Sequence, residues 1–130
     1  MAIIDRLARN ELFAHFTAAN LARLADLLVE QNVAGGSYIL RKGESGTDAF
    51  LIDKGGVRIQ ASTPYGQYAL AIVAHGELIG EASFVDSRPR SSDVWAPNGC
   101  ELLVFPSAAI MPVADADPLF ATALYWTLWK

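Results

Sequence analysis

The sequence has 130 residues, 52% of them hydrophobic and 18% charged, and a formal net charge of −4. This length fits one domain, and the composition supports a packed core and excludes a disordered chain. The acidic and basic residues are interspersed, which excludes the basic footprint of a nucleic-acid-binding protein.

Helical patterns occupy residues 1–32. A short helix is predicted over 3–8, and Thr17 can cap a second helix. Four leucines on one face of that second helix form an apolar stripe: Leu21, Leu24, Leu27 and Leu28. The helical pattern is expected to stop near 33–36, where two glycines follow each other.

Short stretches rich in β-forming residues come next, separated by turns that contain glycine or proline. They cover 37–41, 49–53, 57–61, 67–73, 91–96 and 101–105. Strands at this spacing predict a sandwich or a barrel. Cys100, at the edge of the last stretch, is expected to be a small buried side chain.

After residue 105 the pattern is helical again. Asp117 followed by Pro118 predicts the N-cap and first turn of a helix. Trp126 and Trp129 continue this pattern up to Lys130. They are expected in the core, on a dimer surface or in the first turns of a helical lid.

Residues 80–92 interrupt the strand pattern with a combination that suits an anion. Gly80 allows a close approach of the backbone to a ligand, and a short helix after it would direct its free N–H groups and its dipole at negative charge. Arg90 can hold a phosphate through two parallel hydrogen bonds. Glu81 would repel the same phosphate, so it must face a donor such as a sugar hydroxyl.

This segment resembles the phosphate-binding cassette of cyclic-nucleotide-binding domains. The resemblance rests on Gly80-Glu81-Ala82-Ser83-Phe84 followed by Arg88-Pro89-Arg90-Ser91-Ser92. The family includes the regulatory subunits of protein kinase A, the catabolite activator protein and cyclic-nucleotide-gated channels. The similarity extends over most of the chain, through Lys42-Gly43-Glu44 and the other glycine-spaced early strands to the strand pair at 96–105.

The resemblance implies a mainly β fold with flanking helices, an eight-stranded β-roll or jelly-roll barrel. Residues 1–130 would form a single domain with N-terminal helices over 1–32, a β-barrel over 33–105 and C-terminal helices over 106–130. The cassette would cover 79–92 and contain a short helix.

The resemblance also implies ligand contacts. Glu81 would accept a hydrogen bond from the ribose 2′-hydroxyl, and Arg90 would pair with the cyclic phosphate. The remaining ligand-binding residues would add backbone or hydroxyl donors: Gly80, Ala82, Ser83, Ser91 and Ser92. Trp126 or Trp129 could stack on the base, although no motif assigns that role.

Two features depart from the family pattern. Asp93 would weaken phosphate binding if it faced the pocket, or it would point outward along its strand. The helix that covers the base in the family often continues past the point at which this sequence stops.

A regulatory sensor without catalytic activity is therefore expected, with cAMP or cGMP as its ligand, cAMP favoured, and no cofactor. Binding would move the C-terminal helices, and an effector domain or protein outside this chain would receive the signal. Without a possible disulfide, a signal-peptide pattern or an apolar run of about 20 residues, the chain is expected to be cytoplasmic and not to insert into a membrane. The interspersed charges lead us to expect no nucleic-acid partner. A homodimer is compatible with the sequence.

Other interpretations stay open. Arg90 could form a surface ion pair with Asp86 or Asp93, Arg88 is expected to be solvated, and Ser91 and Ser92 could be ordinary strand residues. A metal enzyme would need clustered ligands, whereas the two histidines lie far apart in the sequence. A degenerate family member could keep the barrel as a protein-interaction module without nucleotide.

Overall fold

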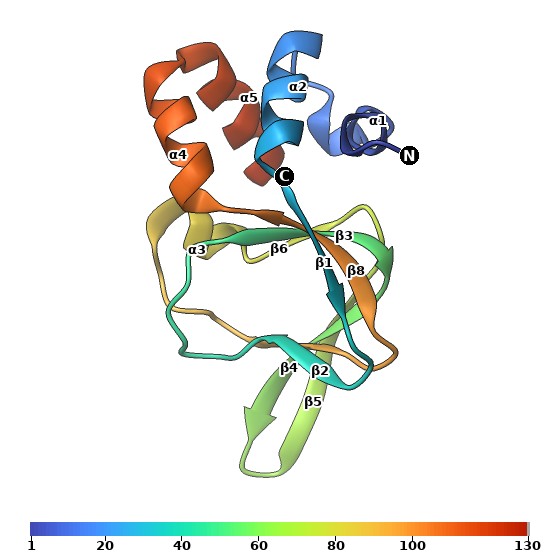
Figure 1. Ribbon diagram of the computed structural model, residues 1–130. Helices are drawn as coiled ribbons and strands as arrows, with labels where there is room; N and C mark the ends of the chain where they lie inside the picture. The colour runs from blue at the N-terminus through green and yellow to red at the C-terminus, as the bar shows by residue number, and fades with distance from the viewer. Residues whose placement is uncertain (130) are drawn as a thin grey trace. The chain divides into compact units, whose positions relative to one another are not determined.

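The computed structural model describes residues 1–129, which divide into two compact units. One unit combines Met1–Val29 with Phe105–Lys130, and the other comprises Glu30–Val104. The helices predicted at the two ends of the chain thus gather in one unit, and the strands form the other (Figure 1). Lys130, the end of the predicted C-terminal helix, lies outside the described residues.

The helical unit contains the predicted helices with one error in their limits. Its elements are α1 (Ile3–Ala8), the 3-10 helix η1 (Glu11–Phe13), α2 (Ala18–Leu27), α4 (Ser107–Ala116) and α5 (Pro118–Leu128). Thr17 caps α2, because its hydroxyl accepts a hydrogen bond from the N–H of Asn20 at 3.2 Å. The helix ends at Leu27 rather than near 33–36, since Leu28 is already extended and a strand follows it.

Aromatic rings from both ends of the chain form the core of this unit. Phe13 and Phe105 stack with their ring centroids 6.1 Å apart, and Phe16 meets the edge of Phe120 at 5.7 Å. Phe105 and Phe120 are fully buried. Burying such large side chains is among the largest single contributions to a small core.

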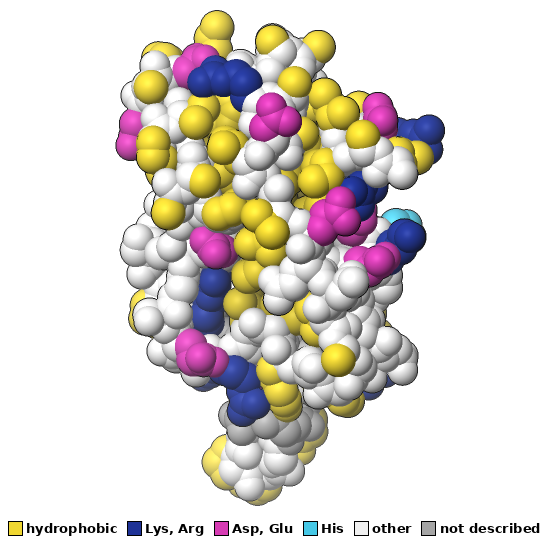
Figure 2. Space-filling model, in the orientation of Figure 1, with side chains coloured by type: hydrophobic (Ala, Val, Ile, Leu, Met, Phe, Trp, Pro, Cys, Tyr) yellow, Lys and Arg dark blue, Asp and Glu magenta, His cyan; other side chains and the backbone are white. Residues whose placement is uncertain are grey.

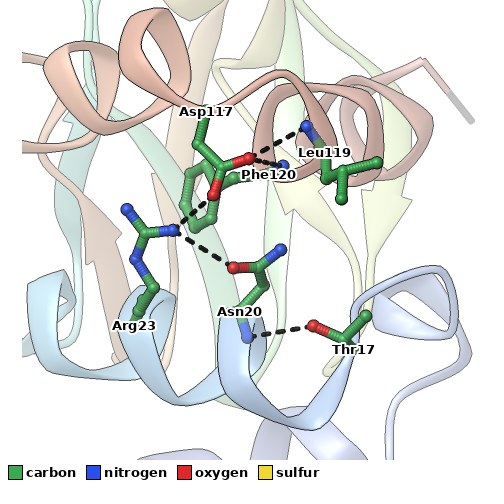
Figure 3. A network of polar contacts seen from close by, with 6 residues as sticks. All are labelled: Thr17, Asn20, Arg23, Asp117, Leu119 and Phe120. Carbon is green, nitrogen blue, oxygen red and sulfur yellow. Dashed lines mark hydrogen bonds and ion pairs between the residues drawn. The ribbon is translucent and has the colours of Figure 1, made fainter.

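A polar network joins α2 to α5 at the surface of the helical unit (Figure 3). Asp117 caps α5 by accepting hydrogen bonds from the N–H groups of Leu119 and Phe120 at 3.0 and 3.3 Å. Its other carboxylate oxygen lies 2.6 Å from the guanidinium of Arg23, which also donates to the Asn20 amide oxygen. The hydrogen bond from Arg23, with those from the helix backbone, lowers the pKa of Asp117.

The β unit contains two four-stranded sheets. One has the order β1 (Val29–Val33), β8 (Cys100–Phe105), β3 (Ala49–Gly55), β6 (Leu78–Ile79). The other has the order β2 (Ser37–Leu40), β7 (Asp93–Ala96), β4 (Val57–Thr63), β5 (Gly66–Val73). The pairs β2–β7, β4–β7, β4–β5 and β3–β6 are antiparallel.

This arrangement confirms a mainly β fold with flanking helices and corrects two details. Each of the six predicted stretches contains a strand, but β1 and β6 were not predicted. β6 has only two residues and β1 is polar in its middle, so neither carries a strong strand pattern. Within residues 1–129 the strands divide between two separate sheets, so a single closed barrel is not confirmed.

The inner sides of the two sheets share one apolar core. Its buried members come from the seven strands β2 to β8: Leu40, Ile52, Val57, Val73, Ile79, Val94, Ala96, Cys100 and Leu102. Cys100 is buried, with 8% of its surface exposed, which confirms the prediction of a small buried side chain. This burial raises the pKa of the Cys100 thiol.

The surface carries both signs of charge. Figure 2 shows acidic and basic side chains interspersed on the visible face, as expected from their distribution along the sequence. Among residues 1–129, no helix has both the length and the apolar character that crossing a bilayer requires.

The Arg23–Asp117 contact predicts a pH-dependent stability of the helical unit. Because folding lowers the pKa of Asp117 from its ordinary value of 3.8, its contribution is complete above that value and disappears as the pH falls through the lowered pKa. Asp117→Asn keeps a capping side chain but loses the ionic contact. Thermal melting followed by circular dichroism should show the variant less stable than the wild type at neutral pH, and the difference should shrink as the pH falls below 3.8 and through the lowered pKa of Asp117.

Asp115→Asn is the matched control, because Asp115 is an exposed acid two residues earlier in the chain. A wild type and an Asp117→Asn protein that melt together at neutral pH would contradict this account.

Candidate functional site

A left-handed glycine begins the segment that builds the site. Gly80 has φ +76° and leads from β6 into the short helix α3 (Glu81–Asp86). A Cβ atom at this position would lie 2.9 Å from Nη1 of Arg90 and 3.1 Å from the carbonyl oxygen of Asp48. Only glycine therefore satisfies both the backbone conformation and the close approach of the arginine.

The segment borders a cavity of about 120 Å³. Its wall contains all seven residues predicted to bind a ligand: Gly80, Glu81, Ala82, Ser83, Arg90, Ser91 and Ser92. The remaining wall is aliphatic and consists of Leu40, Ile59, Leu78, Ile79 and Val94. Polar groups with an acid and a base thus share one small cavity with an apolar surface.

Arg90 is the buried cation of this cavity, with 7% of its surface exposed. Its guanidinium donates hydrogen bonds to two carbonyl oxygens, of Asp48 at 2.9 Å and of Gly80 at 3.3 Å. Burial lowers the pKa of Arg90 from its ordinary value, and the nearby carboxylates of Asp48 and Glu44 oppose that shift. A guanidinium has five N–H donors, so it retains donors for an anion.

The loop of residues 41–48 holds Arg90 in place from the other side. The Gly43 N–H donates to the carbonyl of Arg90 at 2.8 Å, and the Arg90 N–H donates to the carbonyl of Glu44 at 2.9 Å. Gly46 lies against the guanidinium, where an added Cβ would be 3.0 Å from Nη2. Sequence reasoning missed these contacts because the turn residues of the loop indicate a bend but not the side chain on which it packs.

Glu81, which belongs to the cavity wall, has a buried carboxylate oxygen. Its Oε2 atom has no hydrogen-bond partner among the described residues. A buried acceptor without a partner carries a desolvation cost. A donor from a bound molecule, such as a hydroxyl group, would remove this cost.

The first turn of α3 adds backbone donors. The first hydrogen bond of the helix runs from the Phe84 N–H to the Gly80 carbonyl. The N–H groups of Glu81, Ala82 and Ser83 therefore precede any intrahelical acceptor. Ser91 and Ser92 precede β7, so their interpretation as ordinary strand residues is wrong.

The charged neighbours of Arg90 have other partners. The Arg88 side chain is exposed, as expected for a solvated residue, and its Nε lies 2.5 Å from the Asp86 carboxylate. Asp93 accepts a hydrogen bond from the Lys42 N–H at 2.8 Å, and its nearest cation is Arg41 at 3.6 Å. Asp86 and Asp93 thus pair with other cations, and the alternative of an ion pair between one of them and Arg90 is not observed. Asp93 is also not part of the cavity wall.

The two tryptophans do not belong to a core. Trp126 is 54% and Trp129 73% exposed, and Trp126 stacks on His15 with the ring centroids 4.8 Å apart. Their role as a base platform stays a prediction. Among residues 1–129, no three His, Cys, Asp or Glu side chains are placed to hold a metal ion.

Comparisons with known proteins agree with this arrangement. A family model described as the cyclic nucleotide-binding domain matches residues 30–117. The chain is 28% identical over 121 residues to the cGMP-dependent protein kinase egl-4 of Caenorhabditis briggsae. This match covers 90% of the chain and 16% of that kinase. It is 26% identical over 85 residues to the cAMP-dependent protein kinase regulatory subunit of Mycosarcoma maydis, covering 65% of this chain and 16% of that subunit.

A solved structure extends the similarity to the whole fold. The N-terminal domain of a transcriptional regulator from Streptomyces coelicolor A3(2) matches with a TM-score of 0.84 and 31% identity. The match covers 95% of this chain and 87% of that one. By contrast, the chain spans only 16% of the length of the two kinase relatives.

Gly46→Ala tests whether the loop fixes the guanidinium. The backbone of Gly46 needs no positive φ, so alanine should fold there, but its Cβ would press on Arg90. We expect the free energy of unfolding to fall by about 1 kcal/mol and the Arg90 Nε–H nuclear magnetic resonance signal to shift.

Gly56→Ala is the matched control, because its Cβ would only touch the Val73 carbonyl at an ordinary 3.4 Å. An unchanged Arg90 signal in Gly46→Ala would show that the loop does not constrain the guanidinium.

Proposed function

The chain belongs to the cyclic nucleotide-binding domain family, and we propose that it is a regulatory sensor that binds a cyclic nucleotide monophosphate beside α3. In this family the domain is regulatory and non-catalytic, and the relatives carry their enzymatic activity in other domains. The effector that would receive the signal therefore lies outside residues 1–130.

The observation that carries the proposal is that Arg90 and Glu81 both lie in the wall of one cavity. A buried guanidinium with remaining donors suits an anion, whereas the partnerless Oε2 of Glu81 suits a hydroxyl group. A cyclic nucleotide presents a phosphate and a ribose 2′-hydroxyl on one rigid ring system. The N–H groups of Glu81, Ala82 and Ser83 would supply further donors to the same end of the ligand.

The size of the cavity indicates which part of the ligand it holds. Its volume of about 120 Å³ is below the range of roughly 300–1,000 Å³ that is usual for small-molecule sites. The polar residues therefore suit the sugar and phosphate, and the base would extend along the aliphatic wall.

cAMP is the favoured ligand under this proposal. The aliphatic side chains of Leu40, Ile59 and Val94 offer no hydrogen bond to a base edge. Guanine has more polar groups to desolvate there than adenine, and burying a polar group without a partner is costly. Ser91 could assist guanine through its hydroxyl group, so the expected preference for cAMP is modest.

Transmission of the signal would follow the covalent connections between the two units. Val29 begins β1 and Phe105 ends β8, yet both residues belong to the helical unit. β1 and β8 are neighbours in one sheet. A change in the β unit on binding would therefore reach the helices through two adjacent strands, provided that the nucleotide prefers one of two arrangements.

A cytoplasmic location is part of the proposal, because the reducing conditions of the cytoplasm suit the free thiol of Cys100.

Isothermal titration with cAMP and with cGMP tests the proposal. We expect binding at micromolar strength, about −8 kcal/mol, with cAMP tighter. Arg90→Ala should weaken binding by about 2–5 kcal/mol, the scale for removing one partner of a buried charge pair. Arg88→Ala, two residues away on an exposed side chain, is the control and should bind as the wild type does.

A folded wild type that binds neither nucleotide would favour the interaction module instead. Equal affinities for wild type and Arg90→Ala would refute the site assignment.

The role of Glu81 is tested by removing the hydroxyl group from the ligand. Wild type should bind 2′-deoxy-cAMP more weakly than cAMP by about 1–3 kcal/mol, because Glu81 then keeps a buried acceptor without a donor. In Glu81→Ala the two ligands should bind alike. A wild type that does not distinguish them would assign Glu81 another role.

The response of the helices can be measured by hydrogen exchange with and without saturating cAMP. Amides of α4 and α5 should change their protection on binding, because binding and helix arrangement are reciprocally linked. Changes confined to residues 41–94 would contradict transmission through the helices.

A further inference from the structure

Asp93 is a buried acid that the proposed ligand contacts do not use. Only 7% of its surface is exposed, and it lies at the start of β7, outside the cavity wall. Its Oδ1 atom accepts a hydrogen bond of 2.8 Å from the backbone N–H of Lys42. Burying a carboxylate is unfavourable unless hydrogen bonds compensate its desolvation. The hydrogen bond from Lys42 provides such compensation, and we therefore asked what this contact does for the site.

The contact occurs where the sheet stops and the loop begins. The register of β2 with β7 ends at the pair Leu40–Val94. Beyond it, the loop returns to the same segment through the backbone bonds of Gly43 and Glu44 with Arg90. Lys42 lies between the end of this register and the loop contacts, and the Asp93 carboxylate accepts the hydrogen bond of its N–H where a strand carbonyl would otherwise be expected.

The loop held in this way is the one that holds the guanidinium. The Asp48 carbonyl at its far end accepts from Arg90 Nη2 at 2.9 Å, and Gly46 lies against the same group. A continuous series of contacts thus runs from the Asp93 carboxylate through residues 42–48 to the side chain of Arg90.

A simple ion pair with Arg41 accounts less well for the buried acid. The Arg41 Nε lies 3.6 Å away and its side chain is 53% exposed. Its guanidinium also lies over the ring of Tyr38, 3.9 Å from the centroid. Exposed pairs of this kind contribute little, whereas a hydrogen bond from a backbone N–H to a buried carboxylate is charge-assisted and stronger.

We infer that Asp93 is a positioning residue for Arg90: its carboxylate anchors the 41–48 loop through Lys42, and the anchored loop aims the guanidinium into the cavity. The inference rests on the proposed function for its consequence on nucleotide affinity. Its structural part, the dependence of Arg90 on Asp93, is independent of any ligand.

The test compares two variants in the full chain. Asp93→Val keeps the strand-forming character of the position but has no acceptor, whereas Asp93→Asn keeps an oxygen at the same distance from the backbone. In Asp93→Val the exchange of the Lys42 amide should accelerate about tenfold or more, the scale of one hydrogen bond to a charged group. The Arg90 Nε–H signal should move, and the dissociation constant for cAMP should rise by a similar factor.

Asp93→Asn should rescue all three readouts to within about threefold of the wild type, since a neutral acceptor still binds the N–H. Glu101→Val is the control, because it removes an acid of the neighbouring sheet whose pair with Lys54 is exposed. If Asp93→Val does not fold, Asp93→Thr replaces it, with a β-branched side chain too short to reach the loop in the same way.

The outcomes separate the inference from the proposed function. An Arg90 signal that is the same in Asp93→Val and the wild type would overturn the inference, whether or not the protein binds cAMP. A shifted Arg90 signal with unchanged cAMP affinity would also overturn it, because the aimed guanidinium would then not matter for binding. A shifted Arg90 signal in a protein that binds no nucleotide would uphold the positioning of Arg90 and reject the proposed function alone.

Discussion

The buried guanidinium of Arg90 is the group on which the arrangement of the β unit around the cavity depends. A cation with 7% exposure must replace the water that it has lost. Two backbone carbonyls, of Asp48 and Gly80, supply this replacement from segments that are far apart in the sequence. Glycine at Gly80 and Gly46 favours this close approach, because a Cβ atom at either position would lie 2.9–3.0 Å from a guanidinium nitrogen.

The need of buried polar groups for hydrogen-bond partners also explains why the site consists of loops and a short helix between strands. The two sheets enclose an apolar core, and their ladders satisfy the backbone groups of the strands. The polar groups of the cavity wall lie where the ladders end, in residues 80–92, and residues 41–48 hold Arg90 from the other side. Rigid strands on both sides then limit how far these loops can move, which preserves the position of Arg90 without a large interface.

The helical unit has a different basis for its stability. Aromatic rings from both ends of the chain pack together, and Asp117 both caps α5 and contacts Arg23 on α2. Phe105 belongs to this packing although it is the last residue of β8. Val29 and Phe105 thus belong to strands by their backbone and to the helical unit by their packing.

The sequence by itself determined the helices that have strong caps, the six strands with clear β patterns and the chemical character of residues 80–92. These features depend on local preferences: Thr17 and Asp117 cap helices, and Gly80 permits a left-handed turn. It did not determine β1, β6 or the true end of α2, because Leu28 continues a helical apolar stripe although its backbone is extended.

Only the tertiary structure decided how Arg90 is held and where Asp93 points. Residues 42–48 and 90–93 are separated by more than forty positions, and their contacts are mainly hydrogen bonds to backbone atoms. Every residue except proline has the same backbone donor and acceptor, so a pattern of side chains does not predict such a contact. The candidate arginine is thus visible in the sequence, whereas the groups that surround it become visible only when the chain has folded.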